Sequence, residues 1–178
     1  MPLSSETRAA LEAALNEDPG AVIETLAETH GVSPAEVIDC LPDGQVVSVD
    51  GARFEALMGE LATWGELTLI VHTPDLVLEA RGVLPPGAMG RGFYNLHGTP
   101  IGGHFRADRC AHIHLVSRKL FDKDTHSIQF YNRDGSCMFK VYLGRDAARQ
   151  MIPEQVTRFL ALRQRIEDGL PIHSEERS

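Results

Sequence analysis

Cysteine is scarce in this chain, and no cysteine lies near another. The three cysteines, Cys40, Cys110 and Cys137, are far apart, so neither a CxxC pair nor a CxxCH segment occurs. This excludes cysteine-rich zinc knuckles, a thioredoxin-like redox motif and covalent attachment of a c-type haem. An odd number of separated cysteines indicates reduced, buried thiols.

The sequence also lacks long apolar runs and the common catalytic signatures. No apolar stretch approaches the ~20 residues that a membrane-spanning helix needs. The first residues, Met1 to Ser5, contain no basic stretch followed by an apolar one, so we expect no secretory signal and a cytoplasmic location. There is no HExxH segment, no phosphate-binding loop and no recognisable catalytic triad, so none of these chemistries is indicated.

Basic residues are outnumbered by acidic ones, 17 to 25, which gives a net charge of −8. An acidic chain is poorly suited to bind nucleic acid or anionic membranes, and we expect neither as a partner. However, the segment from Arg81 to Lys119 holds six basic residues and only one acidic residue, Asp108. This local basic region is either a site for a small anionic ligand or chance clustering on a solvated face.

The composition that remains is typical of a globular protein, with 43% hydrophobic and 24% charged residues among 178. We expect one domain over residues 1–178, with residues 1–18 and 169–178 flexible. The expected helices are 5–16, 20–30, 34–41, 52–64 and 153–166. The expected strands are 45–50, 66–72, 76–83, 92–96, 103–107, 110–117, 127–132 and 137–143, whereas the proline- and glycine-rich segment 84–90 is expected to be a loop.

Short turns between successive strands predict a meander, and therefore a mostly antiparallel sheet. Helices at both ends of the chain must cover this sheet. The predicted fold class is α+β, with an extended sheet and flanking N- and C-terminal helices.

The second and third expected helices have the spacing of a helix-turn-helix, because His30 to Ser33 form a short turn between them. Ser33 and Glu36 have the spacing of a capping box at the start of the third helix. No Lys or Arg occurs between Gly20 and Pro42, whereas DNA affinity depends on cations that contact phosphates. We therefore favour a helical hairpin that packs on the sheet, with a DNA-binding regulator as the alternative.

His112 and His114 are two residues apart on an expected strand, so their side chains point to one face. With a third ligand, such as Asp122 or His126, they could hold zinc or copper. The competing interpretation, which we favour, is a solvated strand face that carries two histidines.

The most unusual segment runs from Arg91 to Arg106, where two strand-like pieces flank a glycine-rich turn. Its residue types suit haem, because ferric iron takes imidazole or phenolate ligands, the porphyrin needs apolar walls and the propionates need cations. A half-buried hairpin with a strand tyrosine and a solvent-facing histidine is the alternative. The segment supplies Tyr94, His97, His104, Arg91, Arg106, Phe93 and Phe105.

Several short motifs between about Gly20 and Ile166 occur in the order, and at nearly the spacing, of a known protein family. They are Trp64-Gly65-Glu66, Val71 to Asp75, Gly92 to Leu96, Gly103-His104, Cys110, Ser117 to Lys119, Asn132 to Gly135 and Leu143 to Asp146. On these landmarks the sequence resembles the HutX/ChuX family of intracellular haem-utilisation carriers.

The resemblance implies a fold similar to one half of the HemS/ChuS-type haem-handling proteins, and a homodimer. It implies a cytosolic carrier, not an enzyme, that binds haem b without a covalent bond and passes it to a haem-degrading enzyme. A haem-degrading, oxygenase-type enzyme is the first alternative function, and a helix-turn-helix regulator is the second.

The resemblance also implies the site residues. Tyr94 matches a family tyrosine that can ligate iron, and His72 and His104 match histidines tied to haem binding in other members. The order of the Phe-Tyr pair after Gly92 is reversed in some relatives. We rank Tyr94 first, because a phenolate holds ferric haem yet releases it on reduction or ligand exchange, with His104 as the alternative iron ligand. Arg91, Arg106 and Phe105 complete the expected haem site.

Overall fold

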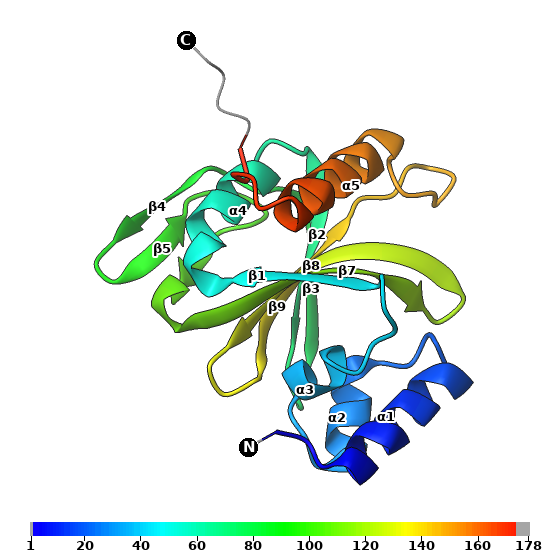
Figure 1. Cartoon of the computed structure of the whole chain (residues 1–178). Coiled ribbons are helices and arrows are strands. Elements are labelled where there is room, and N and C mark those ends of the chain that lie inside the picture. The colour runs from blue at the N-terminus through cyan, green and yellow to red at the C-terminus, as the bar shows by residue number, and fades with distance from the viewer. Residues whose placement is uncertain (1, 174–178) are drawn as a thin grey trace.

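A six-stranded antiparallel sheet lies at the centre of the computed structural model, which describes residues 2–173 (Figure 1). The helices are α1 (Ser5–Glu17), α2 (Ile23–His30), α3 (Pro34–Ile38), α4 (Phe54–Leu61) and α5 (Pro153–Glu167), with short 3-10 turns η1 (Gly51–Arg53) and η2 (Ala107–Arg109). The strands are β1 (Val46–Asp50), β2 (Glu66–His72), β3 (Val77–Val83), β4 (Gly87–Gly90), β5 (Phe93–Leu96), β6 (Gly103–Phe105), β7 (Cys110–Leu120), β8 (Lys123–Asn132) and β9 (Cys137–Leu143).

The central sheet has the strand order β1-β7-β8-β9-β2-β3, and every pair in it is antiparallel. The predicted α+β fold with an extended antiparallel sheet is therefore confirmed. The predicted simple meander is wrong, because β9 returns to pair with β2, and β4-β5-β6 form a separate three-stranded sheet. Pro85 and Pro86 lie between β3 and β4, where they cannot donate hydrogen bonds to a continuing sheet.

The predicted loop 84–90 contains a strand, β4, whose Met89 is opposite Tyr94 of β5. A side chain at Gly87 would collide with the Tyr94 ring, so the ring packs directly on the Gly87 backbone. The loop prediction was wrong for residues 87–90 because glycine there permits close packing and does not mark a turn.

Two hydrophobic cores lie on the two faces of the central sheet (Figure 1). The main core joins one face to α4, α5 and the small sheet. The second core joins the N-terminal helices to Val116 and Tyr131 on the opposite face. The predicted packing of the α2–α3 hairpin on the sheet is therefore confirmed, and the second helix of that pair has only 5 residues.

The N-terminal segment begins with a helix, as expected for residues 5–16. Residues 5–17 form α1 because Leu11 and Leu15, at helical spacing, are both buried in the second core. Residues 174–178 of the expected flexible tail lie outside the described residues.

Gln155 ties α5 to the ends of two strands. Its side-chain Nε2 donates to the Trp64 and Glu66 carbonyl oxygens at 2.9 and 2.8 Å, and its Oε1 accepts from the Gly144 N–H at 2.7 Å. All three backbone groups would otherwise lack a partner in the interior.

Of the three cysteines, Cys40 and Cys110 are buried, as predicted, whereas Cys137 is half-buried. Within residues 2–173, none of the helices combines the length and the apolar character that a membrane span requires.

Candidate functional site

The segment from Arg91 to Cys110 does not form one cluster, because successive side chains on its strands point to opposite faces. Tyr94 on β5 is opposite Phe105 on β6, and both rings pack inward on Phe54 at centroid distances of 5.5 and 6.5 Å. Tyr94 is only 3% exposed, and burial raises the pKa of its phenol. Tyr94 is thus shielded from a surface ligand, and its phenolate form is disfavoured.

The outer face of the small sheet carries His104. The Asn95 amide nitrogen donates to the Gly90 and Phe93 carbonyls at 3.0 Å, which fixes the amide with its Oδ1 2.6 Å from His104 Nδ1. This arrangement favours a proton on Nδ1 and leaves Nε2 free to act as a ligand. His104 is therefore an accessible imidazole on the side of the sheet away from Tyr94.

The expected propionate partners on this segment are exposed at its edges. Arg106 donates two hydrogen bonds, of 2.9 and 2.8 Å, to the carboxylate of Asp108 in the same turn. The charge of Arg106 is therefore already paired. Arg91 lies in the turn between β4 and β5 with a φ of 54°, and His97 lies just after β5; both are exposed. The structure therefore divides the expected site between a buried half and a surface half.

His112 and His114 share a face, as predicted, with stacked rings 6.2 Å apart. His114, however, is 4% exposed, its Nδ1 lies 2.6 Å from Ser48 Oγ, and burial lowers its pKa to about 4. The favoured interpretation of a solvated face is wrong for His114, because its ring packs on Tyr131 of the second core. It holds for His112, which is exposed.

The third metal ligand proposed for these histidines does not reach them. His126 lies on the opposite face of the central sheet, stacked on Phe159 of α5 at 4.6 Å, and Asp122 lies in the β7–β8 turn. Across residues 2–173, no three His, Cys, Asp or Glu side chains are grouped to hold a metal ion.

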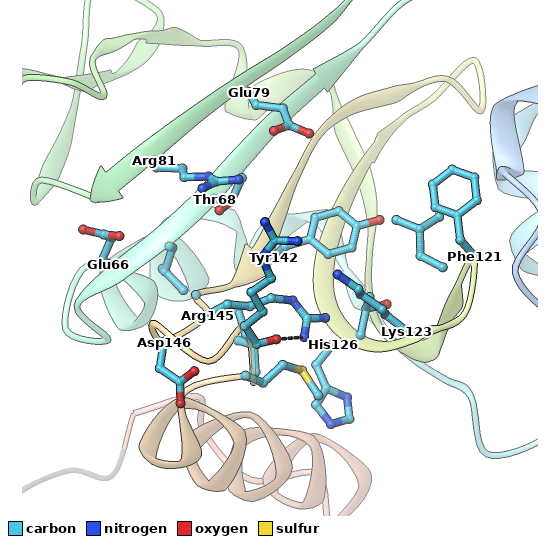
Figure 2. A pocket seen from close by; sticks show the side chains of 17 residues that line it. Glu66, Thr68, Glu79, Arg81, Phe121, Lys123, His126, Tyr142, Arg145 and Asp146 are labelled. Atoms are coloured by element: carbon cyan, nitrogen blue, oxygen red, sulfur yellow. Dashed lines mark hydrogen bonds between the residues drawn. The ribbon is translucent and has the colours of Figure 1, made fainter.

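A cleft crosses the central sheet on the face away from α4 and the small sheet; we call it the sheet cleft. It consists of two adjoining cavities of about 490 and 190 Å³, the first of which Figure 2 shows. The two share the lining residues Glu79, Leu120, Phe121 and Tyr142. Together they are in the size range of small-molecule sites, roughly 300–1,000 Å³.

The smaller cavity contains His72, at the end of β2. His72 Nδ1 lies 3.4 Å from Glu24 Oε2 on α2, and Lys140 Nζ on β9 lies 2.5 Å from the other oxygen of Glu24. Burial lowers the pKa of Lys140, but Glu24, together with Tyr142 and Cys137, raises it by more, so the net pKa is raised and Lys140 stays protonated. The rest of the wall combines polar side chains with an apolar part formed by Val22, Ile23, Ile70, Val77, Leu120 and Phe121.

The larger cavity has a cationic rim that includes Arg81, Lys123 and Arg145 (Figure 2), and Arg149 also lines it. Arg145 donates to the Arg149 and Asp124 carbonyl oxygens at 3.0 and 2.8 Å, which holds its guanidinium in place. None of these four cations belongs to an ion pair among the described residues. Their charges are therefore available to an anionic ligand, alongside the acidic Glu66, Glu79 and Asp146 of the same rim.

Phe121 stands where the two cavities meet. It lies in the tight turn between β7 and β8 with a φ of 54°, which is rare for a bulky residue. Its N–H donates to the Gly20 carbonyl at 3.2 Å, yet its side chain is 72% exposed. An exposed aromatic ring held in this way can serve as a wall for a flat ligand.

The sequence pointed to His72 only through the family resemblance, and it did not point to Glu24, Lys140 or Phe121. The alternation of a strand places Lys140 and Tyr142 on one face. No sequence signal connects Glu24 to that face, because their contact depends on how α2 docks on the sheet.

Comparison with known proteins identifies one family. The family model described as Haem utilisation ChuX/HutX matches residues 47–162. The chain is 34% identical over 152 residues to the intracellular heme transport protein HutX of Vibrio cholerae serotype O1. The matched region covers 84% of this chain and 79% of HutX.

Solved structures agree with this assignment. The heme-binding protein ChuX superimposes with a TM-score of 0.80 at 38% identity, over 88% of this chain and 99% of ChuX. The heme-degrading enzyme ChuS of Escherichia coli O157:H7 gives a TM-score of 0.68 at 15% identity, over 86% of this chain but only 46% of ChuS. The predicted likeness to one half of a ChuS-type protein is therefore confirmed at the level of the fold, and the chain belongs to the haem-utilisation ChuX/HutX family.

Proposed function

We propose that the protein is a cytoplasmic haem carrier that holds haem b without a covalent bond in the sheet cleft, with His72 as an axial ligand of the iron. One observation carries this proposal: an imidazole, apolar side chains and cations line a single hollow surface. These are the three groups that iron, porphyrin and propionates require. The names of the relatives support it, since HutX is an intracellular heme transport protein and ChuX a heme-binding protein.

The two cavities suggest how haem would be oriented. Ile70, Val77 and Phe121 offer apolar surface beside His72 in the smaller cavity. Arg81 and Lys123 in the larger cavity would pair with the propionates. His104, on the small sheet, is the alternative iron ligand, whereas Tyr94 would need the small sheet to separate from the core before it could reach iron.

We propose carriage of haem, with delivery to a separate haem-degrading enzyme, as the function rather than haem degradation. Degradation needs oxygen to be activated in a guarded distal pocket. The sheet cleft instead borders an aromatic side chain that is 72% exposed. A surface cleft favours transfer of an intact cofactor between proteins.

We also propose a homodimer that forms through β3. This strand is at the edge of the central sheet, and Leu76, Val77, Leu78 and Val83 on or beside it are each 53–58% exposed. An apolar edge strand is a template for pairing with another strand. A second copy of the chain would cover this edge and extend the sheet.

The experiment is a titration of the purified protein with ferric haem, followed by the Soret absorption band. We expect saturation near one haem per chain. Reversing two rim charges, Arg81→Glu with Lys123→Glu, should weaken binding by about tenfold, which is about 1.4 kcal/mol. Arg109→Glu, an exposed charge outside the cleft, is the matched control.

Uptake that does not saturate would contradict specific haem binding. Equal affinity in the double variant and the wild type would contradict the placement of the propionates. Addition of reductant and oxygen tests the alternative function. Steady conversion of bound haem to an open tetrapyrrole would mean that the protein is a haem-degrading enzyme and not a carrier.

A further inference from the structure

We infer that Glu24 is a positioning residue for His72, so that the N-terminal helices complete the haem site. This inference rests on the proposed function. The family model begins at residue 47, so Glu24 lies outside the matched segment.

The geometry of Glu24 is unusual for a buried carboxylate. Its side chain is 15% exposed, and among residues 2–173 neither of its oxygens has a well-aligned hydrogen bond. Both oxygens nevertheless face charged or chargeable groups, with Oε2 3.4 Å from His72 Nδ1 and Oε1 2.5 Å from Lys140 Nζ. A buried acceptor with unused capacity is costly unless another state of the protein uses it.

Iron binding to His72 would use that capacity. A histidine that ligates a metal through one ring nitrogen almost always donates from the other to a carboxylate, carbonyl or water. Because Glu24 faces Nδ1, the proton belongs on Nδ1 and Nε2 is the atom left for iron. The carboxylate then fixes the ring orientation and makes the imidazole a stronger electron donor, which favours ferric iron.

Lys140 holds Glu24 in place for this role. Lys140 is 6% exposed, and its ammonium group neutralises the carboxylate. The helix has independent anchors, because Arg118 donates to the Pro19 and Ala21 carbonyls at 2.9 and 2.8 Å, and Ile23 and Ala27 are buried. Replacement of Glu24 should therefore leave α2 docked on the sheet.

A purely structural ion pair between Glu24 and Lys140 is the competing explanation, and redox-dependent binding separates the two. We would measure the affinity of the full chain for ferric and ferrous haem, and the electron paramagnetic resonance of the ferric complex. Glu24→Gln should lower the ferric affinity relative to the ferrous affinity by about tenfold and shift the ferric resonance. Glu28→Gln, an exposed residue on the same helix, should change neither.

Glu24→Asp provides a variant that keeps the buried charge beside Lys140 but draws the carboxylate back from His72. It should change the affinity ratio in the same direction as Glu24→Gln, and it decides the question if Glu24→Gln does not fold. An unchanged ratio and resonance in the folded variants, while His72→Ala alters the haem spectrum, would overturn the role of Glu24 and leave the proposed function intact. An unchanged spectrum in His72→Ala would instead overturn the placement of haem in the cleft.

Discussion

Single residues determine how the protein responds to pH, and His114 is the clearest case. Burial lowers its pKa from 6.5 to about 4, so the unfolded chain binds a proton more readily between these values. This titration therefore leaves the free energy of unfolding unchanged above pH 6.5 and lowers it as the pH falls from 6.5 toward 4. The full effect is about 3 kcal/mol, of which about 1.4 kcal/mol is lost at about pH 5.5.

The His114→Asn variant tests this. Urea unfolding at about pH 7.5 and about pH 5.5 should show a smaller pH effect in the variant than in the wild type, by about 1.4 kcal/mol. His112→Asn removes the neighbouring imidazole, whose charge also lowers the pKa of His114, and should reduce the pH effect by less than His114→Asn does. Parallel pH profiles for wild type and His114→Asn would show that His114 titrates normally in the folded state.

Tyr94 and His104 show which features of the site could not be predicted from the sequence. With β5 paired to β6 in the observed register, alternation along each strand places Tyr94 and His104 on opposite faces of the small sheet. It does not tell which face is buried, because that depends on whether α4 covers the inner side. The phenol ranked first as an iron ligand turned out to be a core side chain, and the imidazole ranked second is exposed.

Among the elements, α5 depends on one buried amide for its attachment. Replacing Gln155 by Leu would leave the Trp64 and Glu66 carbonyls and the Gly144 N–H without their partner. We expect a loss of about 3 kcal/mol in the free energy of unfolding, since each unsatisfied buried group costs about 1–3 kcal/mol and some will find water. Urea denaturation measures this loss.

Gln164→Leu is the matched control, because Gln164 is exposed on the same helix and its side chain donates to the exposed Asp168 carboxylate. It should change stability by less than about 0.5 kcal/mol. A Gln155→Leu variant as stable as this control would mean that the three hydrogen bonds contribute little to the fold.

The edge strand β3 gives a second expectation at the scale of elements. Leu78→Lys places a charge on the exposed apolar edge, at a residue that is 58% exposed and does not line the sheet cleft. If two copies pair through β3, light scattering should give about twice 19.6 kDa for the wild type and 19.6 kDa for the variant. Leu170→Lys, exposed elsewhere, should remain a dimer; a monomeric wild type would rule out the homodimer.

Helices and hairpins were the elements that the sequence predicted well. The capping box at Ser33 and Glu36 and the short turn between β8 and β9 depend on local chemistry. The order of strands in the sheet, and the existence of β4, could not be predicted, because partner choice depends on packing between distant segments. The Gly87 backbone under the Tyr94 ring is one such contact.

For the molecule as a whole, the sheet cleft is assembled from three distant parts of the chain. The N-terminal helices supply Glu24, β2 supplies His72, and β9 supplies Lys140. Sequence landmarks led to the family, but only the folded sheet brings these residues together. The segment from Arg91 to Arg106, whose residue types suit haem best, does not form one site. Strand alternation places Tyr94 and His104 on opposite faces of the small sheet.

The location of haem is tested most directly by a parallel titration of three variants with ferric haem: His72→Ala, His104→Ala and Tyr94→Phe. With haem in the sheet cleft, His72→Ala should shift the Soret band and weaken binding by at least about tenfold, whereas the other two should stay within about twofold of the wild type. A wild-type spectrum and affinity in His72→Ala, with the band lost in Tyr94→Phe or His104→Ala, would contradict this location and place haem at the small sheet.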